Sequence, residues 1–154
     1  MNSITSSTSS SYHTCVLAHP IKPHFADNLY TLAKISEGVC CRVMVPAGGM
    51  WLALYETRPT MAITGSIFVV ACVPSKVFAE SFPDDWKLCT AARNYPYQLV
   101  IPQHLHARVR FSQAVVFPKG DRTFRQPVTW KIPEFLYESF REQFNTSRKQ
   151  CLMM

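Results

Sequence analysis

The last four residues, Cys151-Leu152-Met153-Met154, have the residue types and spacing that accept a lipid. A cysteine at this offset, followed by two apolar residues and methionine, fits the C-a-a-X prenylation pattern, in which a final methionine usually directs a farnesyl group. The offset matters because the transferase recognises the free carboxylate and the apolar residues together. The sequence therefore predicts lipidation of Cys151. The alternative is a chance cysteine in a frayed tail.

A single prenyl chain holds a protein at a membrane only weakly, so a second signal is usually required. Cations near anionic lipid could supply it at about 1 kcal/mol each. We expect this contact with an anionic surface to involve four cations of the C-terminal third: Arg125, Lys131, Arg148 and Lys149. No apolar run reaches the ~20 residues that span a bilayer, so any membrane contact is expected to be peripheral.

Residues 106–112 alternate between apolar and basic or polar side chains, which is typical of a strand with one basic face. Arginines two residues apart on a strand lie about 7 Å apart, a separation that can follow successive phosphates. We predict contact with RNA or ribonucleoprotein for the cations on and just after this strand: His106, Arg108, Arg110, Lys119 and Arg122. The alternative is an ordinary solvated sheet face.

A short motif occurs at Tyr95-Pro96-Tyr97-Gln98-Leu99. A tyrosine-proline pair followed by leucine resembles the motifs with which enveloped-virus proteins recruit a host membrane-scission adaptor. Tyr95, Pro96 and Leu99 are therefore candidate budding residues. The alternative is a loop that enters a strand.

Evidence for catalysis is thin, and we expect a non-enzymatic protein without a cofactor. Ser, His and Asp residues occur in no order typical of a triad, and Gly-rich phosphate loops are absent from the sequence. A cysteine-dependent hydrolase using Cys89 with His104 is one alternative. The first residues have neither the basic start nor the apolar core of a signal peptide, so we expect the six cysteines to be reduced thiols in an intracellular protein. A zinc site is the alternative, although the cysteines include no C-x-x-C pair.

Composition and charge indicate a globular binding protein. Hydrophobic residues make up 47% of the 154 residues and charged residues 17%, which suits one folded core. The net charge is +6, and most of the excess comes from residues 101–154, which hold nine basic and four acidic side chains. A one-sided positive charge favours an anionic partner.

Residue patterns predict an α+β fold, with a twisted mixed or antiparallel sheet, two main helices and a long surface loop. We expect a disordered Ser/Thr-rich leader at 1–11, one globular domain at 12–145, and a flexible basic tail at 146–154. The first helix is predicted at 24–37 and the second after Pro133. Strands are predicted at 12–18, 39–45, 51–55, 61–73, 106–112 and 127–132, and the loop, with one short helix, at 74–97.

The order of these elements resembles that of matrix proteins of negative-strand RNA viruses, particularly rhabdoviruses. The matching segment is Val100-Ile-Pro-Gln-His-Leu-His106, which precedes a long amphipathic strand over 107–117. The resemblance implies a structural virion protein that links ribonucleoprotein to the inner envelope face and supports assembly and budding.

From the residues and the resemblance together, we expect a membrane-peripheral adaptor of viral matrix type. Its expected partners are an anionic membrane, viral nucleocapsid or RNA, further copies of itself and a host membrane-scission adaptor. Its expected location is the host cytoplasm, the inner membrane face and the virion. The competing hypothesis is a nucleic-acid-binding accessory protein, such as a viral silencing suppressor or movement protein.

Overall fold

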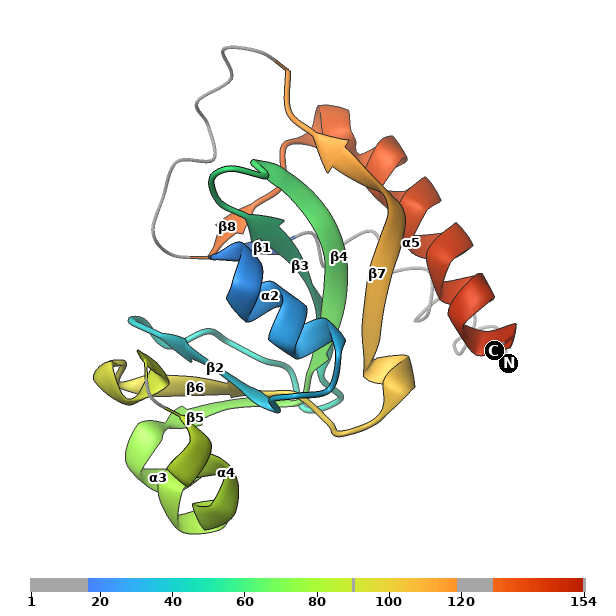
Figure 1. Ribbon diagram of the computed structural model, residues 1–154. Coiled ribbons are helices and arrows are strands. Elements are labelled where there is room, and N and C mark those ends of the chain that lie inside the picture. Colours follow the sequence, from blue (N-terminus) through green and yellow to red (C-terminus); the bar gives the residue numbers. More distant parts are fainter. Residues whose placement is uncertain (1–16, 90, 119–128, 154) are drawn as a thin grey trace.

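Two β-sheets and a long C-terminal helix organise the chain (Figure 1). The computed structural model describes residues 17–89, 91–118 and 129–153. The predicted leader at 1–11 and three of the predicted binding cations, Lys119, Arg122 and Arg125, lie outside these ranges. Within them the chain forms a single α+β domain with one mixed and one antiparallel sheet, as the sequence predicts.

The strands are β1 (Leu17–Ile21), β2 (Ser36–Val39), β3 (Met50–Glu56), β4 (Ala62–Val69), β5 (Ala71–Pro74), β6 (Tyr97–Val100), β7 (Arg108–Val116) and β8 (Trp130–Lys131). The α-helices are α2 (Pro23–Tyr30), α3 (Ser75–Ser81), α4 (Pro83–Leu88) and α5 (Tyr137–Met153). Three short 3-10 helices join them: η1 (Ala91–Asn94), η2 (Leu105–Ala107) and η3 (Glu134–Leu136).

The larger sheet has the strand order β7-β4-β3-β1-β8, in which β1 and β3 run parallel and the other pairs are antiparallel. Strand β4 of this sheet changes register between Ile63 and Gly65, where a bulge or bend is predicted. A Cβ atom at Gly65 would collide with the backbone of Val109 and the ring of Tyr30. Glycine at this position therefore lets β7 and α2 approach the strand.

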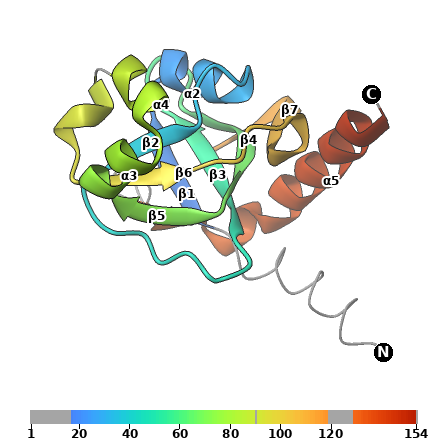
Figure 2. The ribbon, with the colours of Figure 1, turned by 90° about the horizontal axis from the view of Figure 1, so that it is seen from below.

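The smaller sheet has the order β2-β6-β5 and is antiparallel throughout. Figure 2 shows it beside α3 and α4, on the side of the molecule away from α5. A strand is predicted at 39–45, but β2 lies at Ser36–Val39, where the backbone pairs with β6. After Val39 the chain leaves the sheet, and Val43 and Val45 pack against the main core without a strand partner.

Helix α2 is shorter than predicted. It ends at Tyr30 because Leu32 adopts a left-handed backbone conformation (φ 66°), which the helix cannot continue through. The chain then turns sharply at 31–35 and enters β2. This turn folds Lys34 back toward Phe25 of α2, where it pairs with Glu37. A continuous helix would instead leave both residues on its own surface.

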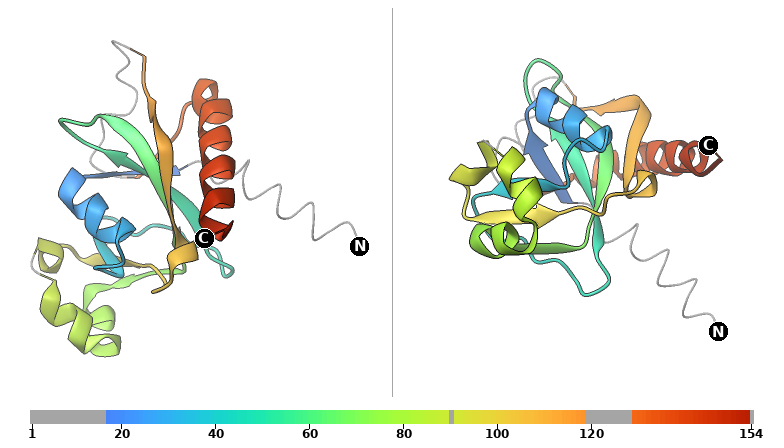
Figure 3. Two further views of the ribbon diagram at one scale, coloured as in Figure 1. Left: turned by 45° about the vertical axis from the view of Figure 1, so that its right-hand side comes forward. Right: turned by 60° about the horizontal axis from the view of Figure 1, so that its bottom comes forward.

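Helix α5 packs along β7 at the edge of the larger sheet (Figure 3). Leu136, Phe140 and Phe144 face the core, which confirms the predicted apolar repeat. Residues 146–153, predicted as a flexible tail, continue the helix instead. The physical reason is that polar side chains of α5 bond the open edge of β7: Ser147 Oγ accepts from the Ser112 amide (3.1 Å) and Gln143 Oε1 from the Gln113 amide (3.1 Å).

Residues 74–97 contain more helix than predicted, because α3, α4 and η1 replace the expected loop with one short helix. Phe78 is fully buried and packs with Ile35 and Val100 in a small core of its own. In the parts of the chain that the structure describes, no helix has the length and apolar character to cross a bilayer.

Candidate ligand-binding cleft

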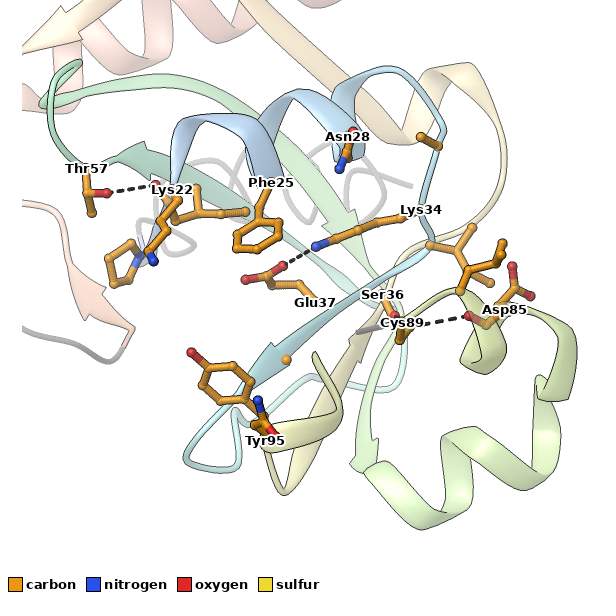
Figure 4. Close-up of a pocket in the computed structure, with 17 residues that line it drawn as sticks. Lys22, Phe25, Asn28, Lys34, Ser36, Glu37, Thr57, Asp85, Cys89 and Tyr95 are labelled. Atoms are coloured by element: carbon orange, nitrogen blue, oxygen red, sulfur yellow. Dashed lines mark hydrogen bonds and ion pairs between the residues drawn. The ribbon is translucent and has the colours of Figure 1, made fainter. Parts of the chain in front are cut away.

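A cleft opens between α2, β2 and the segment that follows α4. It consists of two adjoining cavities, which we call the Lys34 pocket (about 550 Å³) and the Cys40 pocket (about 400 Å³). Figure 4 shows the Lys34 pocket, whose polar and aromatic lining includes Lys22, Phe25, Asn28, Lys34, Ser36, Glu37, Thr57, Asp85, Cys89 and Tyr95. The volume lies in the range of small-molecule sites.

Neighbouring elements place these side chains for local reasons. Pro23 begins α2 at a position that a proline favours, and Lys22 precedes it as an exposed N-cap residue. The turn after α2 then carries Lys34 back over the ring of Phe25, with its ammonium 4.7 Å from the ring centroid. Lys34 is thus fixed by a cation–π contact at the centre of the pocket.

Glu37 is the most constrained charge in the cleft. Its two carboxylate oxygens bond Lys34 Nζ (2.8 Å) and His19 Nε2 (3.3 Å), and its side chain is only 12% exposed. Burial favours a higher pKa for this carboxyl, but the hydrogen bond from His19 and the charges of His19 and Lys34 outweigh burial and lower the pKa below its ordinary value. Glu37 therefore carries its negative charge in the wall of the pocket.

Tyr95 lies where the two pockets adjoin. It lines both of them, and its ring lies against Gly38 of β2, where a Cβ atom would come within 2.7 Å of Tyr95 Cδ2. The Ser75 hydroxyl donates to the Tyr95 carbonyl (2.5 Å), which holds the backbone at this point. Tyr95 remains 43% exposed, so it is accessible to a ligand.

Cys89, the thiol of the alternative hydrolase, lies in the Lys34 pocket. Its Sγ contacts Ser36 Oγ (3.7 Å) and the Asp85 carbonyl (3.4 Å). His104, its predicted base, lies beyond β6, with its ring near that of His106 (6.3 Å between centroids). The structure therefore gives each of the two residues different neighbours. Across the described residues, no three His, Cys, Asp or Glu side chains gather as a metal site would require.

The expectation that Arg108 presents a basic strand face is wrong. Arg108 is 3% exposed, and its guanidinium donates to the carbonyls of Leu29 (2.5 Å), Lys34 (3.0 Å), His104 (3.2 Å) and Pro102. Burial lowers its pKa. The side chain joins the end of α2 and the turn after it to the segment before β7, and it is not available to a phosphate.

The other described cations of the prediction are scattered. Arg110 is exposed, but it pairs with Asp27 (3.0 Å) and lies over the ring of Tyr30 (4.9 Å). Arg148, on α5, lies over the ring of Trp51 (5.2 Å to the ring centroid). His106, Lys131 and Lys149 are exposed on three different elements. The structure does not bring these side chains to one site, and none of them lines the cleft.

The structure bears differently on the two short motifs of the sequence, the predicted budding motif at 95–99 and the prenylation motif at 151–154. Leu99 is completely buried in β6, so the predicted budding motif cannot present its leucine to a partner, and that prediction is wrong. Pro96 follows Tyr95 at the entry to β6, as the alternative of a loop entering a strand requires. Cys151 is half-buried in the last turn of α5, and its lipidation stays a prediction.

The patterns of the sequence do not predict the cleft. Its signal is weak: a lysine and a glutamate three residues apart, followed by Gly38, inside a segment predicted as helix. In the sequence, Tyr95 stands out only as part of the predicted budding motif. A glycine directly after a charged pair, where a helical pattern stops, is the one local sign that the chain turns and exposes these groups.

Comparison with known proteins gives the fold. No protein-family model matches the chain, and no curated protein matches it. Two mutant forms of ZmASCH from Zymomonas mobilis are similar in structure: one with a TM-score of 0.59 and 16% identity over 82% of this chain and 94% of that chain, the other with 0.58 and 15% over 82% and 96%. ASCH from the same bacterium matches with 0.54 and 17% identity, over 89% and 92%.

The chain has the ASCH fold. The predicted resemblance to rhabdovirus matrix proteins is therefore wrong, because ASCH proteins from Zymomonas mobilis share the fold of this chain. The expectations that rested on the resemblance are corrected with it: a structural role in budding, and a place in the virion, in the host cytoplasm or at the inner membrane face. The order of elements misled because the segment after Val100 leads into η2 and a buried arginine, not into a basic surface strand.

Proposed function

We propose that the cleft binds a nucleotide unit of single-stranded RNA, and that the chain is a nucleic-acid-binding module without catalytic activity. The observation that carries this proposal is the exposed ring of Tyr95, seated on Gly38 beside an ionised carboxylate and two lysines. Proteins that bind single strands use such exposed aromatic rings as stacking platforms, with cations along the backbone.

The two aromatic side chains support a stacked base. Tyr95 lies on one side of the Lys34 pocket and Phe25 on the other, as Figure 4 shows. A base between them would exchange water for aromatic surface, at a gain of about 1–3 kcal/mol per stacked base. This contact tolerates any base, so it supplies affinity rather than sequence preference.

Glu37 supports recognition of a base edge. Each carboxylate oxygen can accept two hydrogen bonds, and the structure shows one partner for each, Lys34 and His19. An ionised carboxylate accepts from an exocyclic amino group, as Glu and Asp do with cytosine. We infer a preference for bases that offer an amino donor, cytosine first among them.

Charge supports a strand rather than a free base. Lys22 is exposed at the rim of the Lys34 pocket and Arg42 at the rim of the Cys40 pocket, and among the described residues neither forms an ion pair with an acid. A phosphate on each side of the bound base would lie near one of these cations. The net charge of +6 favours the approach of an anionic strand.

The test is fluorescence anisotropy with a labelled single-stranded RNA of mixed sequence at fixed low salt. We expect Tyr95→Ala to weaken binding about tenfold, the loss of one stacking contact, and Tyr95→Phe to stay within about twofold because the ring remains. Lys22→Ala should weaken binding more than Lys76→Ala, a matched exposed lysine on α3. Equal binding by Tyr95→Ala and wild type, or no binding by wild type, would overturn the proposal.

A further inference from the structure

The Cys40 pocket carries an inference that rests on the proposed function and extends it. We propose that this pocket holds the base of the adjacent nucleotide, so that the cleft binds two consecutive nucleotides on either side of Tyr95. The base it takes is one with an exocyclic amino group.

The first observation is continuity between the two pockets. Pro20, Glu37, Gly38 and Tyr95 line both of them, so a strand that passes over Tyr95 leaves one pocket and enters the other directly. Both faces of a tyrosine ring can stack on a base. A phosphate that links two nucleotides across this ring would lie beside Arg42, which is exposed and lines the Cys40 pocket.

The second observation is a pair of buried polar atoms without partners. Among the described residues, His19 Nδ1 and Thr129 Oγ1 have no hydrogen-bond partner, and both side chains line the Cys40 pocket. His19 is only 5% exposed. Buried polar groups are nearly always satisfied, so two orphaned atoms in the wall of one pocket point to a ligand that satisfies them.

The chemistry of the two atoms defines the ligand. When the ring is neutral, with its proton on Nε2 directed at the Glu37 carboxylate, Nδ1 is an acceptor that needs a donor. The Thr129 hydroxyl can donate to a ring nitrogen. A base with an amino group next to a ring nitrogen offers a donor for His19 and an acceptor for Thr129, and cytosine and adenine are both bases of this kind. Apolar side chains, including Leu17, Val39 and Val43, complete the lining and suit the flat body of a base.

The experiment compares cytidine monophosphate with the dinucleotide pCpC by calorimetry on the full chain. In the wild type we expect pCpC to bind about tenfold more tightly, the gain of a second stacked base. Thr129→Val removes the hydroxyl and keeps the shape, and no internal bond is lost because that hydroxyl has no partner. We expect the advantage of pCpC to fall to about threefold or less, with binding of cytidine monophosphate unchanged.

A second pair of variants blocks the pocket without touching the core. Cys41 is exposed and lines the Cys40 pocket, so Cys41→Phe should fill it and remove the advantage of pCpC, whereas Cys41→Ser should keep it. If cytidine monophosphate binds and Tyr95→Ala weakens it, but neither Thr129→Val nor Cys41→Phe alters the pCpC advantage, the second site is overturned and the proposed function stands. If wild type binds neither probe nor RNA, both are overturned.

Discussion

Glu37 shows how a charged residue can be stable in the wall of a pocket. Two cation-capable partners, Lys34 and His19, bond its carboxylate, and Lys34 is itself fixed over Phe25. Removal of one partner from a buried charged group costs far more than an exposed ion pair contributes. The site therefore keeps its geometry before a ligand arrives, which lowers the entropic cost of binding.

Replacement of this carboxylate should change stability in a pH-dependent way. The folded pKa of Glu37 lies below its ordinary value, so its contribution is complete above the unfolded pKa, about 4.3, and is lost as pH falls through the lowered folded value. We expect Glu37→Gln to cost on the order of 2 kcal/mol in the free energy of unfolding at pH 7. The deficit relative to wild type should shrink as pH falls below about 4.

Urea denaturation at a series of pH values measures this difference. Glu80→Gln, on the exposed face of α3, is the matched control and should stay within about 0.5 kcal/mol of wild type at every pH. A deficit that is constant from pH 7 to pH 3 would show that the lowered pKa of Glu37 makes no contribution to folding.

At the scale of elements, the periodic segments could be predicted and the turns could not. The apolar repeat of Leu136, Phe140 and Phe144 and the alternation at Val109 and Phe111 are buried as the sequence predicts. Both patterns persist because one face of each element packs on a neighbour. The end of α2 depends instead on Leu32 in a left-handed conformation and on a buried arginine that donates to the Leu29 carbonyl, and neither has a local sequence signal.

The same limit explains why the cleft could not be predicted. Its parts come from the end of β1, the turn after α2, the strand β2 and the entry to β6, and only the pairing of β2 with β6 brings Tyr95 to Gly38. Arg108 looks like a surface cation in an alternating strand, yet it bonds four backbone carbonyls across three segments. Long-range contacts of this kind cannot be predicted from local sequence patterns.

The pairing of β2 with the Tyr95 segment makes a prediction about glycine. A Cβ atom at Gly38 would lie 2.7 Å from Tyr95 Cδ2, so Gly38→Ala should push the ring out of its position between the pockets. We expect RNA affinity to fall about tenfold, as with loss of the ring, measured by anisotropy. Gly48→Ala is the matched control, because nothing lies within 4 Å of a Cβ atom there, and it should bind within about twofold of wild type. Equal affinity of both variants would mean that the ring position is not important for binding.

At the scale of the whole molecule, most of the excess positive charge lies in other parts of the chain than those that form the cleft. The C-terminal part of the sequence holds most of the positive excess, and its described lysines and arginines lie on β7, β8 and α5, whereas the cleft lies at α2, β2 and the entry to β6. The cleft itself has Lys22 and Arg42 at its rim. General attraction and specific contact are thus expected to come from different residues.

Salt dependence of RNA binding separates these two contributions. For a single strand, log K falls with log salt with a slope of about −0.7 for each phosphate that a cation neutralises, so contacts from Lys22 and Arg42 predict a slope near −1.4. Lys22→Ala should reduce the slope by about 0.7 and weaken binding to all sequences alike. Lys149→Ala, on exposed α5, should leave the slope unchanged because that lysine is remote from the cleft. Anisotropy titrations at several salt concentrations measure both variants, and a slope that changes with Lys149 but not with Lys22 would place the strand along α5 instead of in the cleft.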